Sequence, residues 1–259
     1  MKRAYVVGAL ALLQLVAPAS AQENLPSAEQ YSLRVEYLWW SPQPSGQIQK
    51  GLGDEAGTVL DVQDDVAVEG NSANDLRGVI RLGQAWKLRG SWTPLDFAGD
   101  ALTTQPTGRY GTVTFQYGDR LVSSLKGNYF TGELAWDFLR RPSGFLGLLV
   151  GVKYFDVDTL VLNADTSERV VETQKLPVPV LGLAGRTYFS RLSLEAEFSG
   201  ITAGSRGSVW ELLFVLRVHV SDRLAGSGGY RWLKLRGEDE RDLLELNLGA
   251  WTFGVEISL

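Results

Sequence analysis

The sequence LVSSLKGNYFTGELAWDFLRRPSGFLGLLVGVKYF, residues 121–155, decides the fold of this chain. Apolar and mixed positions alternate on both sides of a turn at 140–144. Leu134, Trp136 and Phe138 share one phase before the turn, and the even-numbered residues of 146–154 continue such a phase after it. A period of two is typical of β-strands with one apolar face. The stretch therefore predicts a β-hairpin of residues 121–139 and 145–157.

The same alternation recurs along the chain and predicts ten strands. Besides that hairpin they are 31–40, 76–82, 86–93, 177–189, 192–199, 210–220, 225–236 and 243–259. Strand numbers of eight or twelve stay open, because strand ends are hard to place from sequence. Long connections follow every odd-numbered strand and short turns follow every even-numbered one. This segregation is typical of a transmembrane antiparallel up-and-down β-barrel with short periplasmic turns and long extracellular loops. It predicts that both termini lie in the periplasm.

The long connections are 41–74, 94–120 and 158–176, and we expect them to meet the cell exterior. Within them, weak alternation at 58–68 suggests a projecting hairpin, and residues 111–117 suggest a strand extension.

The N-terminus predicts a cleaved signal peptide, residues 1–21. Lys2 and Arg3 precede an apolar stretch, 4–16, and the small-residue sequence 19–21 resembles a cleavage site. The barrel domain is then 22–259. Without Lys2 and Arg3 the net charge changes from −5 to −7, which argues against nucleic acid as a partner. The chain has no cysteine, so it has neither disulfides nor thiolate metal sites.

The signal peptide, the hairpin rhythm and the C-terminal strand together resemble the small outer-membrane β-barrel proteins of Gram-negative bacteria, the general OmpA- and OmpX-like group. The resemblance implies residence in outer-membrane lipid and insertion by the barrel-assembly machinery. That machinery usually reads a C-terminal aromatic residue, whereas this chain ends at Leu259 after alternating Trp251, Phe253 and Val255.

The face opposite the apolar one predicts a charged lumen. Basic side chains concentrate on the second and third strands and acidic ones on the seventh and eighth, which stand across a ten-stranded ring. We therefore expect pairing across the lumen, because charges without access to water must be paired. The basic members are Arg77, Arg81, Lys87 and Arg89, the acidic members are Glu195, Glu197 and Glu211, and Arg217 and His219 also face inward. Such a network closes the lumen of a barrel of this size. The alternative is a narrow, porin-like channel for small polar solutes.

No constellation in the sequence supports catalysis. His219 and Ser221 resemble the His-x-Ser pair of outer-membrane lipid A deacylases, but the predicted phase turns His219 into the lumen. Asp61, Asp64 and Asp65 resemble the aspartates of ten-stranded outer-membrane proteases, but the predicted turn places His219 at the opposite membrane face. The three aspartates match no metal-binding loop. We therefore predict a non-enzymatic barrel with a structural or surface-interaction role and no cofactor, with an outer-membrane hydrolase as the third possibility after the channel.

Overall fold

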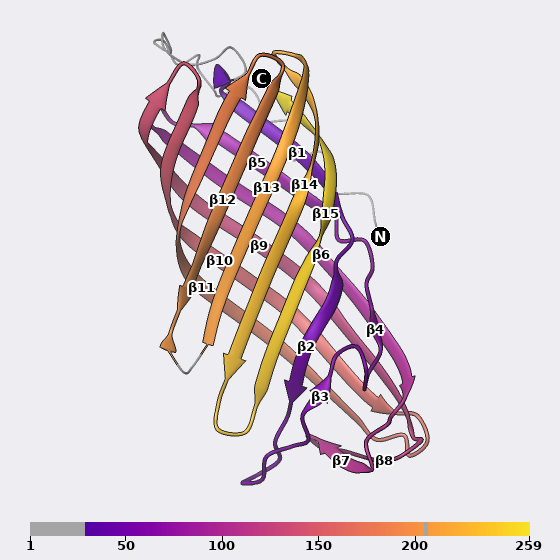
Figure 1. Cartoon of the computed structure of the whole chain (residues 1–259). Helices are drawn as coiled ribbons and strands as arrows, with labels where there is room; N and C mark the ends of the chain where they lie inside the picture. The colour runs from indigo at the N-terminus through magenta and orange to yellow at the C-terminus, as the bar shows by residue number, and fades with distance from the viewer. Residues whose placement is uncertain (1–28, 205–206) are drawn as a thin grey trace, which may run out of the picture.

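Ten long strands, each paired with the next, form an antiparallel barrel in the computed structural model (Figure 1). The structure describes residues 29–204 and 207–259, so the predicted signal peptide lies outside the described residues. The barrel strands are β1 (Leu33–Trp40), β5 (Asp75–Arg81), β6 (Trp86–Leu102), β9 (Arg120–Arg141), β10 (Gly144–Asn163), β11 (Arg169–Phe189), β12 (Leu192–Thr202), β13 (Gly207–Ser221), β14 (Leu224–Glu238) and β15 (Leu243–Ser258). The predicted all-β barrel of ten strands is confirmed.

Pairing of the first strand with the last closes the barrel. β1 pairs with β15 from Arg34 opposite Ser258 to Trp40 opposite Thr252. Beyond Trp40 the chain continues along the same neighbour as β2 (Gln43–Gln49). Closure leaves no free edge along this seam, which is how a spanning sheet satisfies its backbone groups.

The outer surface of the barrel is apolar. Leu148, Trp136, Phe214 and Phe253 all expose more than two fifths of their surface. Large apolar side chains are rarely exposed in such a continuous band unless lipid or a partner covers them. The alternation predicted from the sequence therefore points its apolar face outward. In the described residues, no helix is long and apolar enough to cross a membrane.

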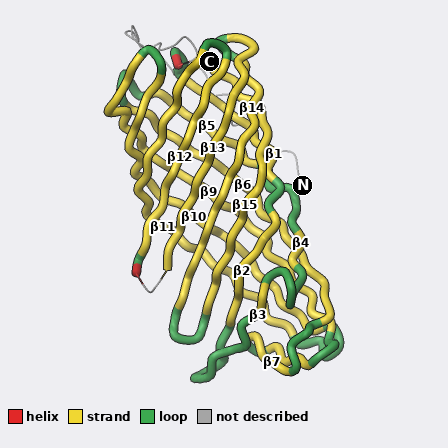
Figure 2. Tube along the Cα trace, in the orientation of Figure 1, coloured by secondary structure: helices red, strands yellow, loops and turns green. Residues whose placement is uncertain are grey.

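Four strands are much longer than the bilayer requires. β6, β9, β10 and β11 contain 17, 22, 20 and 21 residues, whereas about 10 residues span a membrane as a strand. The expectation of long loops at 94–120 and 158–176 was therefore wrong in part, because much of both segments continues the barrel wall. Figure 2 shows these strands running into the end of the barrel where most of the loop tube lies.

Short strands and loops gather at that same end. β3 (Leu60–Asp61) pairs with β2 and β4 (Val68–Glu69) pairs with β6, so the expected hairpin at 58–68 does not form. β7 (Thr107–Tyr110) and β8 (Val113–Gln116) instead make a small separate hairpin. The expected extension at 111–117 thus corresponds to β8 and its turns.

Candidate functional site in the barrel lumen

The lumen contains two chemically different layers. Along β10 the inward-facing Lys153 is followed by Phe155, and along β14 Arg231 is followed by Leu233, all of them buried. Charged side chains fill the half that contains the short turns, and we call this the charged layer. Apolar side chains line the half toward the long strands, and we call this the apolar chamber.

Arg217 lies at the centre of the charged layer. Its Nη1 lies 2.6 Å from Glu195 Oε2, its Nη2 lies 2.8 Å from Glu36 Oε2, and its Nε lies 2.9 Å from Glu256 Oε2. Arg186 Nη2 lies 2.9 Å from the other oxygen of Glu256. These side chains come from β1, β11, β12, β13 and β15. One connected group of ions therefore ties half of the barrel wall together through the lumen.

Glu29 neutralises the basic cluster at the short-turn end. This residue precedes β1 and is completely buried. Its Oε2 accepts hydrogen bonds from Arg81 (2.6 Å) and Lys87 (3.3 Å), and its Oε1 accepts from Tyr188 (2.6 Å) and Arg34 (3.3 Å). The alternation of the sequence does not predict this role, because Glu29 lies outside every alternating stretch. Its only signal in the sequence is a carboxylate just ahead of the first strand.

Glu211 and Arg231 form the boundary of the charged layer with the apolar chamber. Arg231 Nε donates to Glu211 Oε1 at 2.8 Å, and Lys153 pairs with the same carboxylate. The guanidinium of Arg231 lies 4.5 Å from the ring centroid of Trp40, in cation–π geometry. The guanidinium of Arg231, at the edge of the layer, is thus paired with a carboxylate on one side and covered by an aromatic ring on the other.

The charged layer is balanced in charge. Its basic members are Arg34, Arg77, Arg81, Lys87, Arg89, Lys153, Arg186, Arg217 and Arg231. Its ion-paired acidic members are Glu29, Glu36, Asp75, Asp137, Glu195, Glu197, Glu211 and Glu256. Glu133, buried opposite Arg89 in the strand register, is the ninth carboxylate against nine cations. A cavity among these side chains measures about 10 Å³, which is about the room that one water needs.

The structure brings together some of the predicted pairs and not others. Arg77 Nη2 lies 2.8 Å from Glu197 Oε2, and Arg89 contacts the same carboxylate. Lys87 instead lies 2.8 Å from Asp137, besides its contact with Glu29. Predicted partners are in contact where they lie at the same level along the axis of the barrel, whose strands are tilted. The residues nearer the short turns find other carboxylates, as Arg81 does in Glu29.

His219 lies in the lumen beside the short turn between β13 and β14. Its Nε2 is 2.9 Å from Ser193 Oγ, so the serine in contact is not Ser221 of the His-x-Ser pair. Arg186 Nε donates to the same hydroxyl at 3.1 Å. Ser193 is completely buried. Ser193 and His219 are therefore both part of the packed interior of the lumen.

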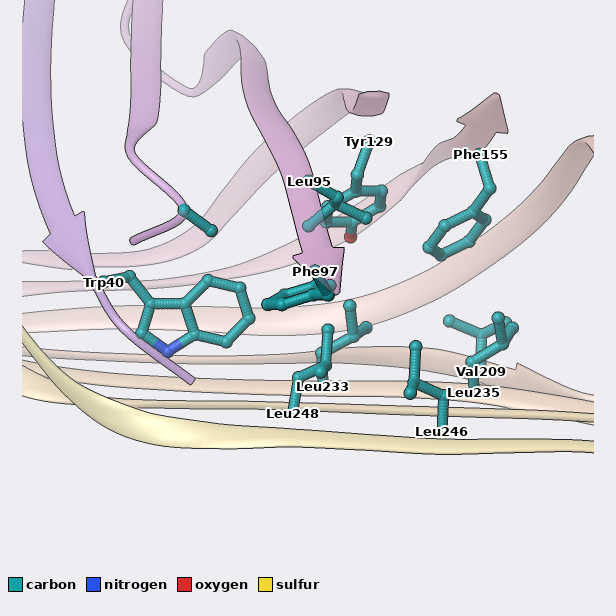
Figure 3. Close-up of a cluster of buried hydrophobic side chains, with 11 residues drawn as sticks. Trp40, Leu95, Phe97, Tyr129, Phe155, Val209, Leu233, Leu235, Leu246 and Leu248 are labelled. Atoms are coloured by element: carbon teal, nitrogen blue, oxygen red, sulfur yellow. The ribbon is translucent and has the colours of Figure 1, made fainter. Parts of the chain in front are cut away.

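The apolar chamber is a cavity of about 510 Å³. Figure 3 shows side chains around it: Leu95 and Phe155 project from one wall, and Leu233, Leu246 and Leu248 project from the facing wall. All of these are less than a tenth exposed. The volume lies within the range of about 300–1,000 Å³ that ligand pockets occupy. The chamber is not predicted from the sequence, because an inward phase that stays polar along the whole strand leaves no apolar lining.

Loops cover the far end of the apolar chamber. Val66 of the loop before β4 and Tyr110 and Phe115 of the β7–β8 hairpin pack against Leu121 and Val161, near the ends of β9 and β10. Burial raises the pKa of the Tyr110 hydroxyl to about 12. These contacts make the loop end a packed cover over the chamber.

The aspartates of this cover are engaged in local structure. Asp61 Oδ1 accepts hydrogen bonds from the backbone N–H groups of Gln63 (2.8 Å) and Asp64 (3.0 Å). Asp65 accepts from the N–H of Asp61 and from the amide of Gln105. Such bonds are typical of turns that begin with aspartate. Among the described residues, no group of three or more His, Cys, Asp or Glu is placed to hold a metal ion.

Lys50, Glu172 and Asp242 form an ion triad at the mouth of the chamber, the rim triad. Lys50 Nζ lies 2.6 Å from Asp242 Oδ2 and 2.9 Å from Glu172 Oε1, and the Gly51 N–H donates to Asp242 Oδ1. The hydrogen bonds with Asp242 and Glu172 raise the pKa of Lys50. Burial works to raise the pKa of Asp242, but the Lys50 and Gly51 donors outweigh it and lower that pKa. The triad connects β11 to the start of β15.

Comparison with solved structures identifies the fold. The outer-membrane protease OmpT from Escherichia coli superimposes with a TM-score of 0.61 at 10% identity, over 88% of this chain and 96% of that one. The translocator domain of the autotransporter NalP from Neisseria meningitidis gives 0.50 at 12% identity, over 88% of each chain. No protein-family profile and no curated protein matches the sequence. The chain is thus a bacterial outer-membrane β-barrel in fold.

Proposed function

We propose that this protein is a non-conducting, non-enzymatic barrel of the outer membrane with a structural or surface-interaction role. The observation that carries the proposal is the charged layer, which fills the lumen with buried and balanced ion pairs. Breaking such a pair by removing one partner costs about 3–5 kcal/mol. Side chains fill barrels of about eight strands, and ten is close to that size. A lumen of this kind holds its side chains in place and leaves no wide aqueous path.

The outward face supports the location and the orientation. Its band of exposed leucine, valine and aromatic side chains fits outer-membrane lipid. The short turns then lie in the periplasm with both termini, and the long strands and their cover reach the cell exterior. The covered end offers the surface through which the protein meets its environment.

The position of His219 supports the absence of catalysis. A hydrolase needs a nucleophile or an activated water that a substrate reaches. Here the hydroxyl beside the only histidine is buried under Arg186, and the aspartates of the opposite end bind backbone N–H groups. OmpT is similar in fold alone, and its proteolysis is not carried over to this chain.

Conductance in a planar lipid bilayer tests the proposal and separates it from the narrow channel. We expect no stable open state from the purified full-length mature protein. The variant Arg217→Ser/Glu36→Ser removes one buried cation and one buried anion, and should give a small ion current. The matched variant Arg120→Ser/Asp100→Ser removes a surface pair (2.7 Å) and should stay silent. A stable open channel formed by the parent protein overturns the closed lumen.

A further inference from the structure

The barrel wall is incomplete between β11 and β12. β11 pairs with β10 along almost its whole length, from Gly144 opposite Thr187 to Leu162 opposite Arg169. Its pairing with β12 ends at Leu181 opposite Gly200. Within the described residues, positions 169–180 of β11 therefore have no partner strand on that side. Pro177 and Pro179 lie in this edge, and proline is tolerated where an N–H is not needed for pairing.

The opening begins at the level of the aromatic rings that mark the membrane boundary. Pro177 lies opposite Tyr154, whose ring is 6.3 Å from that of the outward-facing Phe130. On the other side of the opening, the rings of Phe198 and Trp210 stack at 5.4 Å. Outer-membrane barrels carry aromatic girdles at their interfaces. The unpaired edge thus begins where the outer leaflet meets the headgroups and continues beyond it.

The apolar chamber reaches this opening. Its lining includes Pro177 and Pro179 on the β11 side and Ile201 and Ala203 on the β12 side. Val178, between the two prolines, packs against the cluster of buried side chains inside. A ligand in the surrounding lipid therefore has a lateral path into the chamber that avoids the covered end.

We propose that the apolar chamber binds one alkyl chain of a membrane amphiphile, which enters laterally between β11 and β12. This inference goes beyond the proposed function, which concerns the charged layer. The walls are aliphatic and aromatic, and such walls select an apolar ligand. At roughly 30 Å³ for each methylene group, about the share of a water molecule in the liquid, the chamber of about 510 Å³ has room for a chain of up to roughly 17 carbons. The charged layer closes the bottom, so the chain is held rather than passed on.

The polar head of such an amphiphile stays at the mouth. Lys50 and Arg236 line the chamber near its rim, together with Glu172, Glu238 and Asp242. Lys50 and Arg236 are each paired with carboxylates, Arg236 with Glu238 at 2.7 Å. An anionic head group competes with those carboxylates for the two cations. A free fatty acid and an anionic phospholipid both have an alkyl chain and an anionic head group. They differ in whether the ligand is anchored in the bilayer.

Photo-crosslinking with two probes tests the proposal. The full-length mature protein is reconstituted in phosphatidylcholine vesicles that contain either a 16-carbon fatty acid or a phosphatidylglycerol, each with a diazirine within the acyl chain. After irradiation, mass spectrometry of peptides locates the adducts. We expect both probes to label lumen-facing Leu233, Leu246 and Val209 besides outward-facing residues. Adducts confined to outward-facing residues with both probes overturn the site. Lumen labelling by the fatty acid alone overturns the lateral path.

Matched variants separate occupancy of the chamber from lipid contact. Val178→Trp fills the chamber beside the opening and should reduce lumen labelling at least tenfold, while outward labelling is retained. Val152→Trp adds the same bulk on the lipid face opposite Pro179 and should label like the parent. Folding of both is checked by heat-modifiable migration on gels, and Val209→Phe on the facing wall replaces Val178→Trp if that variant does not fold. Undiminished lumen labelling in a folded chamber-filling variant contradicts the proposal.

Discussion

Replacing Arg217 by methionine should destabilise the barrel strongly. Methionine keeps much of the apolar stem and removes the guanidinium, which is 1% exposed and pairs with Glu36, Glu195 and Glu256. Removing one partner of a buried ion pair costs about 3–5 kcal/mol, because it leaves an uncompensated charge. Since three carboxylates lose a cation, we expect about 4 kcal/mol or more. With a slope near 3 kcal/mol per molar urea, about 4 kcal/mol lowers the unfolding midpoint by roughly 1.3 M.

Glu36 should account for most of this loss. Glu195 also lies near Arg34 (3.4 Å), and Glu256 keeps Arg186 (2.9 Å). Among the described residues, Arg217 supplies the only ion pair and side-chain hydrogen bonds of Glu36. The double variant Arg217→Met/Glu36→Gln should therefore recover about 1.5 kcal/mol or more, within the coupling energies measured for contacting residues. The control Arg223→Met, in an exposed turn, should change stability by no more than about 0.5 kcal/mol.

Reversible urea unfolding in phospholipid vesicles, followed by tryptophan fluorescence and gel mobility, measures the parent and four variants: Arg217→Met, Glu36→Gln, the double variant and Arg223→Met. A free energy of unfolding of Arg217→Met within about 1 kcal/mol of the parent contradicts a strong contribution of this ion group. Additive effects of Arg217→Met and Glu36→Gln also contradict it, because additivity means that the two charges do not interact in the folded state.

Two further predictions concern the ends of the lumen. Glu29→Gln leaves Arg34, Arg81 and Lys87 without their shared carboxylate and should cost about 3 kcal/mol in the same urea assay. By contrast, Asp54→Asn, at an exposed pair with Arg241, should cost less than about 0.5 kcal/mol. At the rim, the folded pKa of Asp242 lies below its unfolded value, so its stabilising contribution is complete above about pH 3.9 and is lost as the pH falls through the folded pKa. Hydrogen exchange at the Gly51 amide, corrected for its intrinsic rate, should stay constant from pH 8 to 5 and accelerate below 4. Asp242→Asn should abolish this pH dependence, and equal acceleration in that variant contradicts the assignment.

The sequence predicts the membrane part of the barrel well because two solvents enforce its alternation. Lipid outside and a charged layer inside keep Leu134 and Trp136 in one phase and Glu133 and Asp137 in the other. Beyond the membrane the outside becomes water. Lys126 then faces outward, where it pairs with Asp96, while the inward positions turn apolar. The register of β9 against β10 is continuous from Asp137 upward, so no bulge resets the phase there.

The same change of solvent explains why the chamber and the strand extensions were missed. At 94–102 the inward positions carry the large apolar residues Leu95 and Phe97, and the outward positions include the charged Asp96 and Asp100. In the phase that faces lipid in the membrane part, this segment has no continuous apolar face. The sequence pattern therefore predicts a loop there. An inversion of phase at constant register is the signal that identifies such an extension.

Which side chains pair in the charged layer depends on their position along the barrel axis. The alternation of apolar and polar residues does not predict that position. It predicts that Arg81 and Arg77 share the lumen face, and the structure places both there. The shear of a tilted barrel then decides whether each meets Glu197 or a carboxylate nearer the short turns. Arg81 meets Glu29, which precedes the first strand and carries no alternation at all. The sequence therefore predicts which side chains face the lumen. Which of these side chains pair with each other depends on the register of the strands.

The charged layer and the apolar chamber adjoin each other in one lumen. The side chains at their boundary decide whether this arrangement is stable. An apolar chamber beside a bare guanidinium would expose that charge to a low-dielectric space, at high cost. Here Trp40 and Tyr129 lie between them, with Arg231 at 4.5 Å and 5.7 Å from their ring centroids. Both rings also belong to the cluster of buried apolar side chains around the chamber (Figure 3). The charged layer therefore meets the buried apolar cluster around the chamber through aromatic carbon. An alkyl chain held in the chamber has no path through the charged layer, so it leaves by the lateral opening through which it entered.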